Sequence, residues 1–139
     1  METTRLFTDL SVPAGGDETR PAEILVRGGR IEAVAAPGEV GRDAAEVVGL
    51  GGRLVLPGAI DGHVHFDDPG FTRREDFETG TRSAAAGGVT TVVDMPCTSL
   101  PPVTSAANLS EKLAVVAPKA HVDFMFWGGV SGDTFRDGS

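Results

Sequence analysis

The sequence predicts an α/β protein in which a small β-rich domain precedes the first units of a parallel (β/α) barrel. Two observations support this fold class. Short aliphatic runs separated by glycine pairs fill residues 1–56, and strand-like and helix-like segments alternate over residues 57–139. Such alternation is typical of parallel sheets with helical crossovers. We therefore expect a domain boundary between residues 56 and 57.

Residues 1–56 are expected to form part of a small β-sandwich-type domain. The glycine pairs 28–29 and 51–52 each stand between two short aliphatic runs, and this pattern predicts two tight hairpins. The polar, glycine-rich segment 13–21 predicts a loop. These strands are too few to close a sandwich, so we expect the partner strands to come from elsewhere.

Residues 57–139 are expected to contain about three strand–helix units. The predicted elements are a strand at 59–66, a helix following the capping-box pattern 72–75, a strand at 89–95, a helix at about 105–117 and a strand at 121–127. The expected buried helix faces are Phe77, Gly80, Thr81, Ala84 and Ala85, then Ala106, Leu109, Leu113 and Val116. Three units do not close a (β/α)8 TIM-type barrel, which typically takes about 250 residues. We therefore expect the N-terminal part of a longer protein.

His63 and His65 are candidate metal ligands. Residues two apart on a strand point to the same face, and imidazole is the commonest metal ligand in proteins. The same spacing adds the carboxylates of Asp61 and Asp67 to this face. The opposite face is expected to be apolar, with Ile60, Val64 and Phe66. The alternative for an isolated His-X-His pattern is a partly buried strand with two structural histidines.

The composition argues against some classes of partner. The 139-residue chain carries a formal net charge of −8 at pH 7, whereas nucleic-acid binding normally requires a basic surface. No apolar stretch reaches the ~18–20 residues of a membrane span, and the first residues lack the pattern of a signal peptide. The single cysteine, Cys97, suits a reducing compartment. We expect a cytoplasmic protein that binds neither nucleic acid nor membranes.

Several short motifs follow one another between Arg27 and Val130. They are Leu56–His65, Asp68–Gly70, Glu75–Thr81, Ala84–Thr91 and Asp94–Pro96. In their order and spacing they resemble the cyclic amidases of the amidohydrolase superfamily, which include dihydroorotases, allantoinases and hydantoinases. The segment Leu56–His65 is similar to the first barrel strand of that superfamily. Val122–Phe124 together with Trp127–Val130 is most similar to the allantoinases.

The resemblance implies two divalent metal ions, usually zinc, at the C-terminal mouth of a barrel. It implies that His63 and His65 bind the more buried ion and that a carboxylated lysine outside this chain bridges both ions. Two further histidines, a liganding aspartate and the catalytic aspartate near the eighth strand are also expected outside it. The ions would activate water for attack on a cyclic amide. His121, at the start of a strand, is expected to be structural.

Two positions bear on the substrate. Dihydroorotases carry an arginine two residues after the second histidine and an asparagine after the Met-Pro pair, where this chain has Asp67 and Cys97. Because an aspartate repels a carboxylate that an arginine would grip, the resemblance favours allantoin or another cyclic ureide. The alternative is that neither residue touches the substrate. Asp61 and Asp94 are candidate groups behind the ligands, with a helix or loop cap as the alternative for Asp94, and Trp127 is expected in the core.

These observations leave three hypotheses for function. The first is a metal-dependent hydrolase that cleaves a ring C–N bond of allantoin or another small ureide, or of dihydroorotate in pyrimidine biosynthesis. The second is a non-catalytic scaffold similar to the dihydropyrimidinase-related proteins, which the retention of His63 and His65 disfavours. The third is a free-standing metal-binding module, which is disfavoured because two histidines do not complete a tetrahedral site. We expect a homo-oligomeric full-length enzyme, and an inactive chain that binds zinc weakly on its own.

Overall fold

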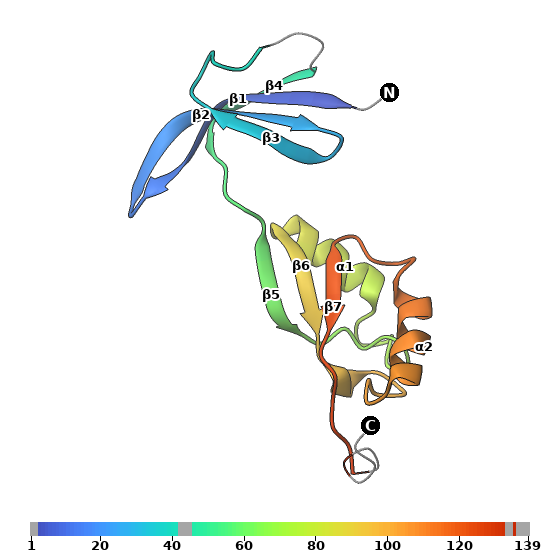
Figure 1. Ribbon diagram of the computed structural model, residues 1–139. Coiled ribbons are helices and arrows are strands. Elements are labelled where there is room, and N and C mark those ends of the chain that lie inside the picture. Colours follow the sequence, from blue (N-terminus) through green and yellow to red (C-terminus); the bar gives the residue numbers. More distant parts are fainter. Residues whose placement is uncertain (1–2, 42–45, 133–134, 136–139) are drawn as a thin grey trace. The chain divides into compact units, whose positions relative to one another are not determined.

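The computed structural model describes residues 3–41, 46–132 and 135 (Figure 1). The chain divides into two compact units, Met1–Pro57 and Gly58–Ser139. In the described part of the chain, no helix has the length and apolar character needed to cross a membrane.

The first unit is a four-stranded sheet with the strand order β3-β2-β1-β4 (Figure 1). Its strands are β1 (Thr4–Gly15), β2 (Glu18–Arg27), β3 (Arg30–Ala35) and β4 (Glu46–Leu54). Neighbouring strands are antiparallel except β1 and β4, which are parallel. Leu10, Ala22 and Ile24 form the buried cluster of this unit. The predicted hairpin at residues 28–29 is confirmed, because β2 and β3 pair antiparallel across it.

The second glycine pair forms a bulge, so the hairpin predicted there is wrong. β4 continues through Gly51 and Gly52, whose φ angles are 63° and 75°. Across these glycines the pairing with β1 skips from Gly49 to Arg53. A bulge requires the same positive φ angles as a tight turn, so the glycine pair alone did not distinguish them.

The segment predicted as a loop at residues 13–21 is also wrong, because it belongs to two strands. β1 extends to Gly15 and β2 starts at Glu18, so a short turn joins them. All residues from 13 to 21 are exposed. A ribbon with no buried face needs no alternation of apolar and polar residues, which is the signal that predicts a strand.

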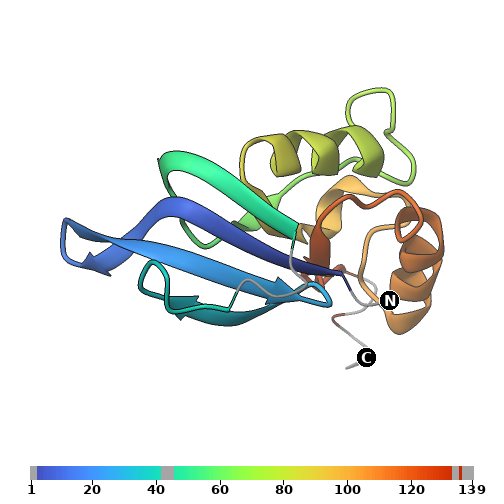
Figure 2. The ribbon, with the colours of Figure 1, turned by 90° about the horizontal axis from the view of Figure 1, so that it is seen from above.

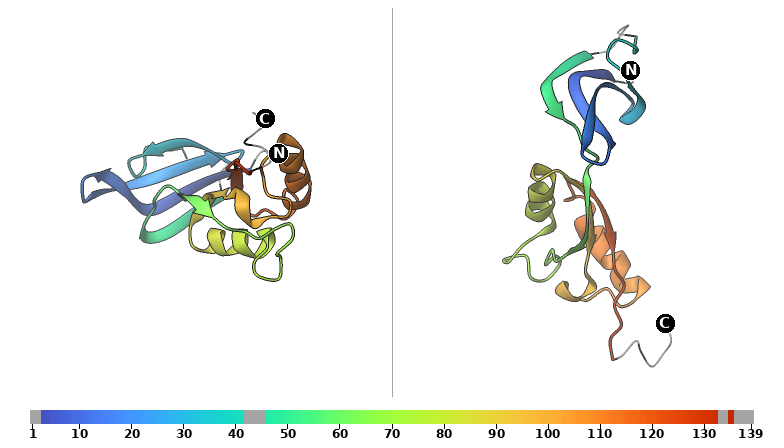
Figure 3. Two further views of the ribbon diagram at one scale, coloured as in Figure 1. Left: turned by 90° about the horizontal axis from the view of Figure 1, so that it is seen from below. Right: turned by 90° about the vertical axis from the view of Figure 1, so that its left-hand side faces the viewer.

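The second unit is a three-stranded parallel sheet with the order β5-β6-β7. Its elements are β5 (Ala59–Val64), α1 (Phe77–Ala86), β6 (Val89–Asp94), the short 3-10 helix η1 (Pro96–Thr98), α2 (Ala106–Val116) and β7 (Asp123–Phe126). Figure 2 and Figure 3 show the chain alternating between strands and helices in this unit. The predicted α/β class and the parallel order are therefore confirmed.

An aromatic cluster holds the helices on the sheet of the second unit. Phe77, at the start of α1, is fully buried, and its ring centroid lies 5.3 Å from that of Phe66 and 5.4 Å from that of Phe124. Val92 of β6 and Val116 of α2 complete the buried cluster. Because Phe66 follows His65 directly, this core fixes the chain just after the candidate ligands.

Helix α1 begins later than the sequence pattern predicts. Thr72 and its neighbours form a turn that is closed by a hydrogen bond from the Arg74 amide to the Phe71 carbonyl oxygen, 2.8 Å long. The N-cap is Asp76, whose carboxylate accepts from the Thr79 amide at 2.8 Å. The predicted capping box is therefore wrong, and an aspartate four residues further on satisfies the free amides of the first turn.

Helix α2 buries a different face from the one expected. Val116 is fully buried, as predicted, but Leu113 is 38% exposed and Ala106 is exposed. Lys112 is only 1% exposed, so the lysine is buried where the apolar pattern predicts its neighbour Leu113. The predicted buried face of α2 differs from the observed one because an apolar pattern does not count a lysine as a core residue.

Replacement of Asp76 by alanine is expected to lower the free energy of unfolding of the second unit by about 1 kcal/mol. The Thr79 amide and hydroxyl lower the pKa of Asp76 below its ordinary value of 3.8. The carboxylate therefore stabilises the fold above that pH, and the contribution is lost as the pH falls below it. Urea unfolding at pH 7 and pH 3 measures both effects. Asp76→Asn is the matched control, because asparagine also caps helices; a stability loss equal to that of alanine at pH 7 would contradict the cap.

Candidate functional site

His63 and His65 lie together at the C-terminal end of β5. Their ring centroids are 5.2 Å apart with an interplanar angle of 64°, and both side chains are exposed. Zinc binds imidazole nitrogens at about 2.0–2.1 Å in a tetrahedral arrangement, which places two ring centres about 5 Å apart. The spacing of the two rings therefore fits one shared ion.

The strand face below the histidines differs from the expected pattern. The pairing of β5 with β6 shifts by one residue between Asp61 and Val64. The pairing also shifts between Ala59 and Ile60. Residues 59–63 are all exposed, Ile60 at 69%, whereas Val64 and Phe66 pack into the core. The predicted apolar face is therefore present at Val64 and Phe66 and absent at Ile60.

The two histidines are not joined by a third metal ligand within the described residues. In residues 3–41, 46–132 and 135, no group of three or more His, Cys, Asp or Glu side chains is arranged to hold a metal ion. His121 precedes β7, and its backbone amide donates to the Thr81 hydroxyl at 3.1 Å. A tetrahedral site takes four ligands, so the two imidazoles supply half of one.

Cys97 lies beside His65. The thiol belongs to η1, is exposed, and its Sγ atom is 4.0 Å from His65 Nδ1. The sequence places these residues 32 positions apart, and the parallel order of β5 and β6 brings their C-terminal ends together. A side chain at position 97 therefore lies next to the ring of His65, the second candidate ligand.

Asp67 is turned into the protein. It is 4% exposed, and its Oδ2 atom lies 3.3 Å from Nε of the exposed Arg74. Its buried Oδ1 atom has no hydrogen-bond partner within the part of the chain that the structure describes. The negative charge that the sequence places two residues after His65 is therefore balanced by a local guanidinium.

The two remaining candidate carboxylates contact the backbone on either side of the histidines. Asp61 is exposed, and its Oδ1 atom accepts from the His63 amide at 3.1 Å. Asp94 is fully buried, and its Oδ1 atom accepts from the Phe66 amide at 2.8 Å. Asp94 was expected to cap a helix or a loop. It caps neither helix of this unit, and its bond to the Phe66 amide holds the loop that follows β5.

Lys112 completes the surroundings of Asp94 and was missed by the sequence reasoning. Its ammonium group forms an ion pair with Asp94 Oδ2, and the two side chains are 1% and 0% exposed. Burial raises the pKa of the Asp94 carboxyl, and the bonds from Lys112 and the Phe66 amide oppose that shift. The available signal was the spacing, because Leu109, Lys112 and Val116 follow the i, i+3, i+7 pattern of one helix face.

Trp127 is not a core residue, contrary to expectation. Its side chain is 54% exposed, and Nε1 donates to the Gly62 carbonyl oxygen at 3.0 Å. The indole therefore reaches from the end of β7 to the backbone next to His63.

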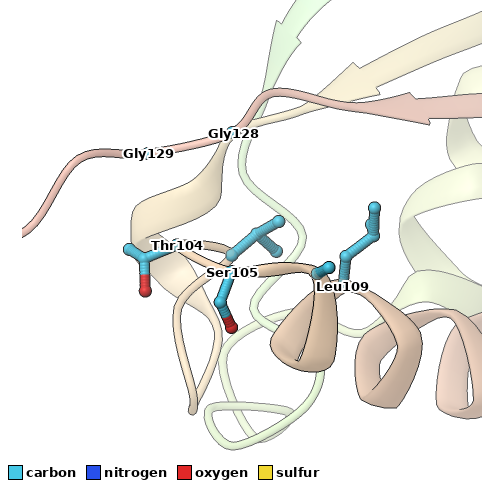
Figure 4. Close-up of a pocket in the computed structure, with 7 residues that line it drawn as sticks. Thr104, Ser105, Leu109, Gly128 and Gly129 are labelled. Atoms are coloured by element: carbon cyan, nitrogen blue, oxygen red, sulfur yellow. The ribbon is translucent and has the colours of Figure 1, made fainter. Parts of the chain in front are cut away.

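The described loops at the C-terminal end of the sheet line cavities. The first has a volume of about 280 Å³ and lies between the start of α2 and the segment after β7 (Figure 4). Its lining includes Thr104, Ser105, Leu109, Gly128 and Gly129. The second, also about 280 Å³, shares Thr104 and Gly129 and includes Cys97. Cys97, whose thiol lies beside His65, therefore helps to line a space that a small molecule can enter.

Comparisons with known proteins agree on one group. Residues 54–133 match the model of the amidohydrolase family. The allantoinase of Streptomyces avermitilis is 47% identical over 137 residues, which cover 99% of this chain and 29% of that protein. A dihydroorotase of Methanosarcina acetivorans is 43% identical over 133 residues, covering 96% of this chain and 27% of that protein.

The fold of this chain is also similar to solved structures of a hydantoinase and a dihydropyrimidinase. The L-hydantoinase of Arthrobacter aurescens superposes with a TM-score of 0.82 at 31% identity, covering 99% of this chain and 31% of that one. The dihydropyrimidinase of Brevibacillus agri superposes with a TM-score of 0.77 at 29% identity, covering 97% of this chain and 29% of that one. The chain therefore spans less than a third of the length of these relatives.

Proposed function

Because the chain belongs to the amidohydrolase family, we propose that it is the N-terminal part of a metal-dependent enzyme that hydrolyses a C–N bond in a small cyclic amide. The observation that carries this proposal is the ring spacing of His63 and His65, which fits one shared ion. Under the proposal, β5, β6 and β7 are the first strands of a (β/α)8 TIM-type barrel, and residues 1–56 are part of a β-sandwich.

The two histidines would hold a divalent ion, zinc in this proposal. Bound there, the ion supplies Lewis-acid chemistry toward a carbonyl oxygen and lowers the pKa of water. Asp61 holds the backbone at His63, and Asp94 holds the backbone just after His65. The bridging carboxylated lysine, the other ligands and the catalytic aspartate would come from outside this chain. The enzyme would work in the cytoplasm as a homo-oligomer, without nucleic-acid or membrane partners.

We propose a cyclic ureide, allantoin or a hydantoin, as the substrate class. The position two residues after His65, which carries arginine in dihydroorotases, holds Asp67 paired with Arg74. That pair has no net charge, so it provides no free cation for a substrate carboxylate. Cys97 provides an exposed, weakly polar surface beside His65 where dihydroorotases have an asparagine. The frequency of allantoinases among the relatives supports the same choice.

The complete polypeptide that carries this chain is expected to hydrolyse allantoin or a hydantoin at least tenfold more efficiently than dihydroorotate, a difference of about 1.4 kcal/mol in transition-state binding. Steady-state kcat/KM values for the three substrates measure this. Cys97→Asn is the informative variant, because it restores beside His65 the asparagine that dihydroorotases have, and we expect it to reduce the preference for the ureide over dihydroorotate. A preference of the unmodified protein for dihydroorotate would move the function to pyrimidine synthesis. Metal binding without hydrolysis of any of the three would favour a non-catalytic scaffold.

A further inference from the structure

The ion pair of Asp94 and Lys112 is the most deeply buried pair of charges among the described residues, with side chains 0% and 1% exposed. Removing two charges from water costs several kcal/mol per ion before their attraction offsets it. Apolar side chains of similar volume often stabilise a core equally well or better. Stability alone therefore does not explain why an ion pair is buried at this position.

Asp94 joins the C-terminal ends of all three parallel strands. It is the last residue of β6, and its carboxylate accepts from the Phe66 amide, one residue after His65, at 2.8 Å. Its backbone carbonyl oxygen accepts from the Trp127 amide at 3.0 Å. The first of these bonds fixes the peptide that joins His65 to Phe66, and so limits the directions in which the imidazole can point.

Lys112 holds the Asp94 carboxylate in place and links it to the loop that carries Cys97. Its Nζ atom binds Asp94 Oδ2 and donates to the Ser99 hydroxyl at 3.2 Å. The ammonium group also lies 5.1 Å from the ring centroid of Phe126. Ser99 is 1% exposed and follows η1, the short helix that contains Cys97. One buried network therefore reaches the backbone amide just after His65 and the side chain of Ser99, two residues after Cys97.

We propose that Asp94 and Lys112 are positioning residues: they hold the His65 ring and the Cys97 loop in register at the mouth of the sheet. The proposal rests on the proposed function only in that His65 is taken as a metal ligand. Groups that orient metal-binding histidines typically change metal affinity or activity by 10- to 100-fold when they are removed. If the network served only the core, its removal would lower stability and leave the metal affinity unaltered.

The test compares two double variants of the complete polypeptide that both remove the buried charges. Asp94→Asn/Lys112→Met keeps an oxygen acceptor for the Phe66 amide, whereas Asp94→Leu/Lys112→Met removes it. Zinc affinity is measured by chelator competition. In the metal-free proteins, NMR of labelled histidine measures the ring-to-ring Overhauser effect between His63 and His65. We expect the leucine variant to bind zinc about 10- to 100-fold more weakly and to lose that effect. The asparagine variant keeps the acceptor but lacks the lysine that holds it, so we expect a smaller loss of both the zinc affinity and the Overhauser effect.

A matched ion pair controls for the general loss of a buried charge pair. Lys119 Nζ lies 2.6 Å from Asp68 Oδ2, and Asp68 is 1% exposed, but that carboxylate accepts from the Phe77 amide at the start of α1. Lys119→Met is expected to lower stability and to leave zinc affinity and the histidine signals unchanged. An equal loss of affinity in Lys119→Met would show a general effect of destabilisation and would overturn the positioning role.

The outcomes separate this proposal from the function it rests on. A folded leucine variant with wild-type zinc affinity and an unchanged Overhauser effect overturns the positioning role and leaves the metal site intact. If the wild type binds no zinc, the proposed function fails, and the histidine signals of the metal-free variants still decide the positioning role. If the leucine variant does not fold, Ser99→Ala tests the same network by removing one bond to Lys112. Unchanged histidine signals and zinc affinity in that variant also overturn the proposal.

Discussion

Replacement of His63 and His65 together by asparagine is expected to abolish hydrolysis of the cyclic amide by the complete polypeptide and to remove one equivalent of zinc. The two rings, 5.2 Å apart, are the only nitrogen ligands that the described residues bring together. Loss of a metal ion removes several kcal/mol of transition-state stabilisation, which corresponds to at least about 10³-fold in rate. Metal content by mass spectrometry and kcat/KM for the best substrate measure the two effects.

His121→Asn is the matched control for this experiment. His121 is exposed and lies before β7, and its observed bond to Thr81 comes from the backbone amide, which the substitution keeps. The variant is expected to retain wild-type metal content and kcat/KM. Full activity in the double variant of His63 and His65 would contradict the proposed metal site, and a loss in both variants would point to a defect in folding.

Replacement of Phe77 by alanine is expected to lower the free energy of unfolding of the second unit by about 3–5 kcal/mol, because a fully buried aromatic ring leaves a cavity that neighbours fill only in part. Its ring contacts Phe66 from the segment after β5 and Phe124 from β7, so the cavity would loosen the sheet at two places. Denaturant unfolding followed by circular dichroism measures the loss.

Arg82→Ala on the same helix is the comparison for Phe77→Ala. The Arg82 side chain is 64% exposed and lies 3.9 Å from the Glu78 carboxylate. Exposed pairs of this kind contribute little, so a change within about 0.5 kcal/mol is expected. If both variants lost the same stability, the aromatic cluster would not be the main core of this unit.

The arrangement of the second unit was predictable from the sequence because its signals are local. A β-branched run at Val89–Asp94, a glycine pair that ends α1 and a proline just after α2 each act within a few residues. The two candidate ligands were predictable for the same reason, since the i, i+2 spacing of His63 and His65 depends only on the geometry of an extended strand and its continuation.

Other features depended on contacts between distant parts of the chain. Cys97 reaches His65 only because two parallel strands end side by side. Asp67 and Arg74 neutralise each other because the turn between them folds back, and no spacing rule predicts that bond. The glycines of β4 form a bulge because β4 pairs with β1, whereas the same residues favour a hairpin in isolation.

The sequence by itself determined the order of strands and helices in the second unit, the position of the histidine pair and the family. The tertiary structure alone decided that Asp94 is the partner of the buried Lys112 ammonium group. The physical reason is that apolar periodicity reports which residues leave water readily, whereas a buried charge is tolerated only where a partner lies within reach. That partner is 18 residues away in sequence and becomes a neighbour only when α2 packs on the end of β6.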